Sequence, residues 1–179
     1  MAYLEIGCRA ALAFVFLIAC TSKIHSASSY REFHDSLADL GLSSGLLLRA
    51  LSLSIPAAEG ITVLLLAVNR AGRWGLLASV ALAGSFTAGI AIARWQGKVV
   101  RCRCFGESGT PSDAAHILRN LVLLAGAAIG AVAGLLAGAS AGGRQTPAMT
   151  VFAVGLGLIA AGLFLRWDEL SFLLKPSAT

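Results

Sequence analysis

Cys102 and Cys104, separated only by Arg103, are the residues whose types and spacing most directly predict chemistry. Two thiols this close can form a disulfide, but the small ring forces its geometry, and a disulfide away from its preferred geometry is easily reduced. Arg101 precedes the pair and Arg103 lies between its two cysteines. Nearby positive charge lowers the pKa of a thiol and raises the fraction of thiolate, which is the attacking species in disulfide exchange. The spacing therefore favours an exchange site over a structural disulfide.

Two other interpretations of this pair stay open. Together with a histidine, the thiols could bind a soft ion such as Cu(I) or Hg(II), although Cys-x-Cys is a less specific pattern than repeated Cys-x-x-Cys. The two residues could also be free cysteines of a loop. Gly106, close behind the pair, would let the backbone of a partner approach it.

Charged residues within or beside apolar runs add a second feature. Glu59 lies inside such a run, where a carboxylate is costly and needs a partner. Lys23 closes the first run and Arg119 opens the fourth, with His116, Arg119 and Asn120 spaced to share one helical face. We expect Lys23, Glu59, Arg119 and Asn120 to form a buried cluster beneath the cysteines, which tunes the thiols or binds a reducible headgroup. The alternative is an ion pair that only fixes the register of the helices.

The remaining cysteines and histidines carry weaker signals. Cys8 and Cys20 lie about 18 Å apart along a helix, so both cannot reach one site. Cys20 lies close to Lys23 and is a candidate third thiol, the alternative being an apolar packing residue. His25 and His34 follow in a polar segment, where we expect solvated side chains.

The composition predicts where these residues are positioned. Of 179 residues, 57% are apolar and 13% are charged, and the mean hydropathy is +0.80. A soluble domain carries roughly 25% charged residues, so the composition excludes a soluble enzyme, a nucleic-acid-binding module and a disordered chain. The net charge of +5 is scattered between apolar runs, which is typical of membrane anchoring rather than of nucleic-acid binding.

A helix that crosses a bilayer needs about 20 mostly apolar residues. Five segments are predicted to meet this requirement, at residues 4–22, 46–68, 74–94, 117–140 and 147–166. We therefore predict an all-α polytopic membrane helical bundle that forms a single domain over residues 1–179. With five crossings, the loops 23–45 and 95–116 share one side of the membrane with the C-terminus. This side, which holds the paired cysteines and all three histidines, is called the cysteine side below.

Two features of the runs have alternative interpretations. Arg9 followed by the apolar stretch to Cys20 resembles the core of a signal peptide, with a lipobox-like end, although a polytopic protein needs no cleaved signal. Four glycines that recur every four residues in the fourth run favour close helix packing inside the bundle, with a homodimer as the alternative. These glycines are Gly126, Gly130, Gly134 and Gly138.

Taken in order, four short motifs resemble those of one family. The motifs are Ser22-Lys23, Pro56-x-x-Glu59, Cys102-x-Cys104-Phe105-Gly106 and Arg119-Asn120. Over about residues 4–140, the chain resembles the methylamine utilisation protein MauE family, near the DoxX-like membrane proteins. The Cys-x-Cys-Phe-Gly motif is the most specific part of this resemblance, and the fifth run carries no motif that matches.

The resemblance implies a four-helix membrane core, to which the fifth helix is added. It also implies disulfide-related work, because MauE is associated with maturation of the disulfide-rich small subunit of methylamine dehydrogenase, alongside a thioredoxin-like protein. Carried over by residue, Cys102 and Cys104 are the exchanging pair of a thiol-disulfide oxidoreductase-like protein. The supporting residues are Lys23, Glu59, Arg119, Asn120, Arg103, Phe105, Gly106 and His116. The expected partners are a thioredoxin-fold redox protein and a client with disulfides; no cofactor follows with certainty, and a quinone is the candidate.

The orientation in the bacterial cell membrane is predicted differently by two arguments. The resemblance places the cysteine pair on the extracytoplasmic side. Basic residues favour the cytoplasmic side of a membrane, and they are more numerous on the cysteine side, at Arg31, Arg94, Lys98, Arg101, Arg103, Arg166 and Lys175, than on the opposite side, at Arg70, Arg73 and Arg144. Because several of these arginines flank the thiols and could serve their chemistry, we favour the extracytoplasmic side.

Overall fold

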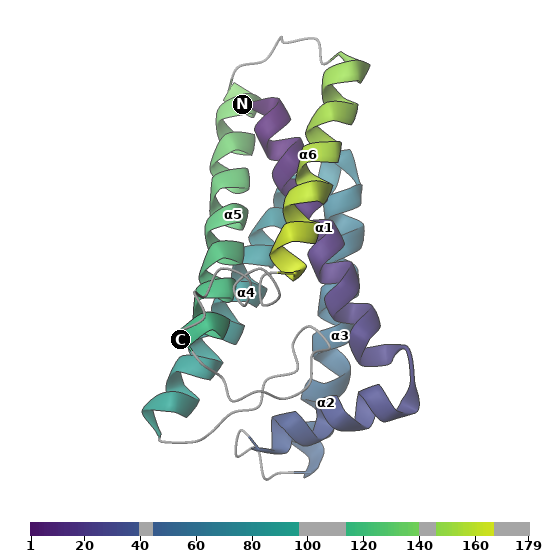
Figure 1. The fold of residues 1–179 in the computed structure, drawn as a ribbon, viewed down its shortest axis with the longest axis vertical. Helices are drawn as coiled ribbons and strands as arrows, with labels where there is room; N and C mark the ends of the chain where they lie inside the picture. The colour runs from purple at the N-terminus through teal and green to yellow at the C-terminus, as the bar shows by residue number, and fades with distance from the viewer. Residues whose placement is uncertain (40–44, 97–113, 140–145, 167–179) are drawn as a thin grey trace, which may run out of the picture.

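The computed structural model describes residues 1–39, 45–96, 114–139 and 146–166 (Figure 1). In chain order the elements are α1 (Ala2–Ile24), α2 (Ala27–Asp39), α3 (Gly45–Ala67), the 3-10 turn η1 (Asn69–Ala71), α4 (Gly72–Trp95), α5 (Ala114–Ala139) and α6 (Pro147–Leu165). The described residues contain no strand, and five of their helices (α1, α3, α4, α5 and α6) are long and apolar enough to cross a membrane. The prediction of an all-α polytopic membrane bundle is confirmed.

The first helix, α1, lies at the centre of the bundle. It contacts α3, α4, α5 and α6, and its buried side chains Leu12, Val15 and Phe16 belong to the main apolar core. Two charged residues of α1, Arg9 and Lys23, therefore lie in the interior of the bundle rather than on its surface. The two ends of the bundle are named below after two of them, the Arg9 end and the Lys23 end.

The outward faces of the membrane helices are apolar as well. Leu64, Leu135 and Val151 are each at least two-thirds exposed, at 67%, 70% and 72%. A soluble protein rarely exposes extended apolar surface, whereas lipid tails are as apolar as these side chains. The exposed leucines and valines are therefore the expected lipid-facing surface.

Glycines allow two close helix contacts with α1. A Cβ atom at Gly130 of α5 would lie 2.9 Å from both Cys8 Cβ and Leu76 Cδ2. At the crossing of α1 and α6, Gly157 lies directly against the carbonyl oxygen of Gly7. By contrast, a Cβ at Gly126 would meet no atom within 4 Å. Packing inside the bundle therefore accounts for part of the glycine period, and a homodimer stays a prediction.

We expected a loop between the first two membrane helices, but residues 27–39 of this segment form the helix α2. Phe33 and Leu37 lie on one face of this helix and are buried against Leu48 of α3. The α2 helix begins after Ser26, whose hydroxyl accepts a hydrogen bond from the Ser29 N–H at 3.1 Å, as is typical of an N-cap. The prediction of a loop is wrong because the segment is mostly polar, and its two buried apolar residues are too few to show a helical pattern in the sequence.

Candidate functional site

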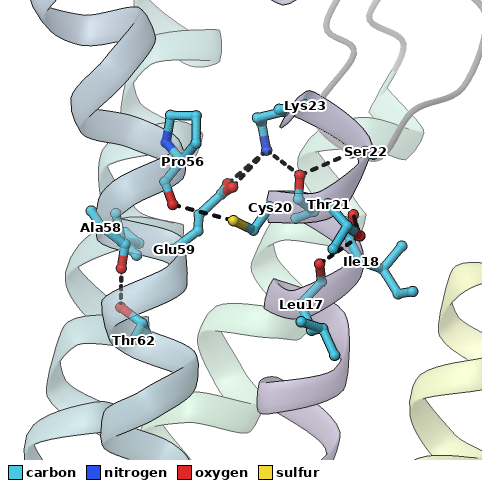
Figure 2. A network of polar contacts seen from close by, with 12 residues as sticks. Leu17, Ile18, Cys20, Thr21, Ser22, Lys23, Pro56, Ala58, Glu59 and Thr62 are labelled. Carbon is cyan, nitrogen blue, oxygen red and sulfur yellow. Dashed lines mark hydrogen bonds and ion pairs between the residues drawn. The ribbon is translucent and has the colours of Figure 1, made fainter. Parts of the chain in front are cut away.

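Lys23 of α1 and Glu59 of α3 form a buried ion pair (Figure 2). Lys23 Nζ lies 2.7 Å from Oε1 and 2.9 Å from Oε2 of Glu59, and it also donates to the Ala19 carbonyl at 3.1 Å. The two side chains are only 1% and 2% exposed. Because an isolated charge is costly within a membrane, the carboxylate of Glu59 and the ammonium of Lys23 satisfy each other there.

A proline one turn before Glu59 shapes this part of α3. Pro56 is buried inside the helix and has no N–H to donate to the preceding turn. Its carbonyl accepts a hydrogen bond from Cys20 Sγ at 3.4 Å, which brings this thiol beside the ion pair (Figure 2). The structure thus brings Cys20, Lys23 and Glu59 together, and the role of Cys20 as a third thiol stays a prediction.

The short helix α2 covers the ion pair. The centre of the Phe33 ring lies 5.4 Å from Lys23 Nζ, a favourable cation–π distance. The hydroxyls of Tyr30 and Ser52 lie 2.9 Å apart and join α2 to α3. Ser52 is fully buried and Tyr30 is half-buried, so this contact is partly shielded from solvent. Within the described part of the chain, α1 and α3 therefore hold the pair and α2 packs against it.

Arg119 binds the end of α6, and among the described residues no direct contact joins it to the Lys23–Glu59 pair. Its Nη2 donates to the carbonyls of Phe164 at 3.3 Å and Leu165 at 3.1 Å, and its guanidinium lies 5.7 Å from the centre of the Phe164 ring. A cation at these carbonyls is favourable because the C-terminus of a helix carries partial negative charge. Asn120, the next residue of α5, is also buried. Of the four residues expected to cluster, Lys23 and Glu59 thus bind each other, whereas the described contacts of Arg119 are with α6.

The cysteine pair lies outside the described residues, as do Arg103, Phe105 and Gly106, and the side chain of His116 is likewise not described. What the structure describes is where their segment attaches. Residues 97–113 connect the end of α4 to the beginning of α5, and both of these helix ends lie toward the Lys23 end of the bundle (Figure 1).

A comparison with family models places these residues in a known family. The model of the methylamine utilisation protein MauE matches residues 1–137. The chain belongs to the MauE family. No curated protein and no solved structure matches the chain. Family membership indicates a multi-pass membrane protein related to methylamine utilisation, as the resemblance of the motifs predicts.

The matched MauE region contains α1 to α4 and most of α5, but not α6. The hydrogen bonds from Arg119 to Phe164 and Leu165 therefore fasten an additional helix to the family region. The sequence could not reveal this partner, because it consists of backbone carbonyls in a run without a recognisable motif.

Sequence reasoning also missed a buried arginine at the other end of α1. Arg9 Nε and Nη2 donate to the Leu66 carbonyl at 3.0 and 2.7 Å, and Nη1 lies 3.7 Å from the Glu5 carboxylate. Its guanidinium packs directly against Gly72, where any side chain would collide with it. The spacing of Glu5 and Arg9, four residues apart on one helix, was the available signal.

The described residues contain no group of three His, Cys, Asp or Glu side chains that could hold a metal. His25 Nε2 lies 3.3 Å from the Ser29 hydroxyl, and His34 Nδ1 lies 3.5 Å from the Asp35 carboxylate. Both histidines are accounted for by local contacts of α2.

Proposed function

We propose that this MauE-family protein exchanges disulfides with an extracytoplasmic partner through Cys102 and Cys104. The observation that carries the proposal is the buried Lys23–Glu59 pair at the end of the bundle to which the cysteine segment attaches. Apolar side chains of similar size often stabilise a fold as well as a buried ion pair does, or better. A charged pair within a membrane protein is therefore a sign of function.

The exchange needs no reagent beyond the two proteins. The thiolate of one cysteine attacks a sulfur of the partner's disulfide, whose S–S bond breaks as a mixed disulfide forms and the leaving thiolate takes a proton. The second cysteine then loses its proton, attacks the mixed disulfide and releases the partner. One partner disulfide is reduced to two thiols, and Cys102 and Cys104 become a disulfide. A thioredoxin-fold dithiol can reverse these steps and reset the pair.

The ion pair would support this chemistry by providing groups that accept and donate protons at the end of the bundle to which the cysteine segment attaches. Each attack requires a thiol to lose a proton, and each departure requires a thiolate to gain one. A carboxylate and an ammonium bound at 2.7 Å supply an acceptor and a donor of protons together. Cys20, hydrogen-bonded beside them, would be a further thiol within this region.

Trapping a mixed disulfide tests the proposal. The full chain, in lipid nanodiscs, is prepared as Cys102→Ser and Cys104→Ser variants and mixed with oxidised thioredoxin. Exchange predicts that the variant keeping the attacking cysteine accumulates a covalent complex, which dithiothreitol releases and mass spectrometry locates. A matched Cys8→Ser variant should behave as the unmodified protein, because Cys8 lies at the other end of the bundle, against Gly130.

Other outcomes would favour the alternative functions. If neither cysteine variant traps a complex and both lose binding of Cu(I), the pair handles a soft metal. If both variants keep the maturation of a client at its normal level, the protein is a non-catalytic assembly factor. Labelling of the two thiols in intact cells with an impermeant maleimide, with and without prior reduction, tests the proposed extracytoplasmic orientation.

A further inference from the structure

A cavity of about 250 Å³ lies beside α1 at the Arg9 end of the bundle. Its walls come from α1, from the end of α3 with η1, and from the beginning of α6. Three polar residues line it among apolar ones, namely Arg9, Asn69 and Thr150. Arg9 is only 9% exposed, so a buried cation forms part of the wall of this cavity. Such a wall favours an anionic ligand.

The polar and apolar linings of the cavity lie at different depths. The α1 and α6 helices both begin at the Arg9 end and run in the same direction (Figure 1). Along them, Arg9 and Thr150 come before the apolar lining residues Ala13 and Val154. Asn69 lies beyond the last turn of α3. The cavity therefore becomes apolar toward the middle of the bilayer, as a phospholipid does from its phosphate to its acyl chains.

Two aromatic residues place this end of the bundle at the membrane interface, where the phosphates of lipids lie. Trp74, in the first turn of α4, is 60% exposed. The hydroxyl of Tyr3 accepts a hydrogen bond from the N–H of Thr146, just before α6, at 3.1 Å. Trp and Tyr are enriched at the level of the headgroups. Asn69 follows the end of a membrane helix at the same level.

Positive charge exceeds negative charge around the cavity. Arg9 Nη1 lies 3.7 Å from the carboxylate of Glu5, which offsets one positive charge. Arg70 and Arg73 are exposed at the same end of the bundle and add two more. The described residues that line the cavity include no carboxylate and no aromatic ring, so the ammonium of a zwitterionic lipid finds no partner among them.

Asn69 and Thr150 provide hydrogen-bonding groups beside the guanidinium. The Oδ1 atom of Asn69 accepts a hydrogen bond from Arg9 Nη2 at 3.5 Å, and among the described residues no acceptor engages its amide nitrogen. This nitrogen can donate to a phosphate oxygen. The hydroxyl of Thr150 donates to the Thr146 carbonyl at 3.2 Å, so its oxygen can accept from a hydroxyl of the headgroup.

We infer that this cavity binds the headgroup and the first part of an acyl chain of an anionic phospholipid, with phosphatidylglycerol as the type. Arg9 and Asn69 face the phosphate, and the apolar depth of the cavity takes the chain. The bound lipid joins α6 to the family region at the Arg9 end, as Arg119 does at the Lys23 end. The inference goes beyond disulfide exchange and uses no cysteine, so each of the two can fail without the other.

Native mass spectrometry of the full chain in detergent micelles tests the inference. The chain is titrated with phosphatidylglycerol and with phosphatidylcholine that carry identical acyl chains. We expect the first phosphatidylglycerol to bind about tenfold more tightly than the first phosphatidylcholine. Equal affinity for the two lipids would overturn the inference. Complete displacement of phosphatidylglycerol by inorganic phosphate would also overturn it, because inorganic phosphate has no chain for the apolar depth.

Two variants locate the lipid. Asn69→Asp keeps the oxygen that accepts from Arg9 but replaces the amide donor by a negative charge. Ala67→Phe places a ring in the cavity from an exposed position at the end of α3. We expect each variant to lose the roughly tenfold preference for phosphatidylglycerol. Gln96→Glu, which adds the same charge at the Lys23 end, and Val68→Phe, on a neighbour that does not line the cavity, should keep it.

A preference that survives in both Asn69→Asp and Ala67→Phe would overturn the inference, and so would its loss in both control variants. Neither test variant removes the hydrogen bonds from Arg9 to the Leu66 carbonyl, so both leave this fastening of the helices in place. If one of the two test variants does not fold, the other decides the question.

Discussion

The two ends of the bundle hold buried charge in different ways. At the Arg9 end, one guanidinium binds the Leu66 carbonyl twice and lies 3.7 Å from Glu5 of its own helix, and these two side chains are 10% and 19% exposed. At the Lys23 end, an ammonium and a carboxylate from two different helices lie 2.7 Å apart and are 1% and 2% exposed. Arg9 donates its two shortest hydrogen bonds to a backbone carbonyl, whereas Lys23 donates its two shortest to a titratable side chain.

This difference separates charge that fastens helices from charge that can take part in chemistry. Arginine is always charged and its planar donors suit fixed acceptors, so Arg9 is a permanent clamp between α1 and the last turn of α3. Lysine and glutamate can each gain or lose a proton. A proton that moves between Lys23 and Glu59 leaves their total charge unchanged, and therefore adds no net charge within the membrane.

Removing one partner of the Lys23–Glu59 pair should have the largest effect. Glu59→Leu leaves an uncompensated buried ammonium, and we expect a loss of about 3–5 kcal/mol in the free energy of unfolding. Lys23→Met combined with Glu59→Leu should restore the stability to within roughly 1 kcal/mol of the original. Reversible unfolding in lipid bicelles, followed by circular dichroism, measures both values.

The double variant also sharpens the comparison of the two ends. If the pair serves chemistry, the double variant folds but no longer forms the mixed disulfide with thioredoxin at the normal rate. If the double variant folds and exchanges disulfides at the normal rate, the Lys23–Glu59 pair only holds helices together, as Arg9 does.

Loss of the Arg9 clamp should have a smaller effect on stability and none on exchange. Arg9→Leu removes both hydrogen bonds to the Leu66 carbonyl and a longer one to Asn69, and we expect a loss of about 2–3 kcal/mol. Unfolding in bicelles measures the loss, and the rate of mixed-disulfide formation should stay normal in the folded fraction. Arg70→Leu, on an exposed arginine at the same end, is the matched control, with little expected change in stability. A slowed exchange reaction in Arg9→Leu alone would link this end to the chemistry and break the comparison.

Of the two ends, only the Lys23–Glu59 pair could be predicted from the sequence. A carboxylate in an apolar run needs a cation, and Lys23 at the end of a neighbouring run could supply it, so the pair follows from side-chain types. Arg9 and Arg119 were harder, because their partners are the carbonyls of Leu66, Phe164 and Leu165. Every residue has a carbonyl, so only the packing of the helices determines which carbonyls are available.

The membrane helices were predictable for the same kind of reason, and α2 was not. A run of about 20 apolar residues has one stable form in a bilayer, because all backbone groups must be satisfied internally. Residues 27–39 are polar, and their few apolar side chains identify a helix only once the face of α3 that they contact is known.

The smallest expected effect concerns the second buried arginine, at the Lys23 end. If Arg119 fastens α6 as Arg9 fastens α3, Arg119→Gln should cost about 1 kcal/mol, the typical value of a cation at a helix C-terminus. We expect the loss to be largest in α6, because Phe164 and Leu165, whose carbonyls accept hydrogen bonds from Arg119, both belong to its last turn. Hydrogen exchange read by mass spectrometry should therefore speed up in α6 and not in α1 or α3, while Arg94→Gln, on an exposed arginine at the same end, changes nothing. Faster exchange that spreads to Lys23 and Glu59 would instead join Arg119 to the ion pair and restore the single cluster that the sequence suggested.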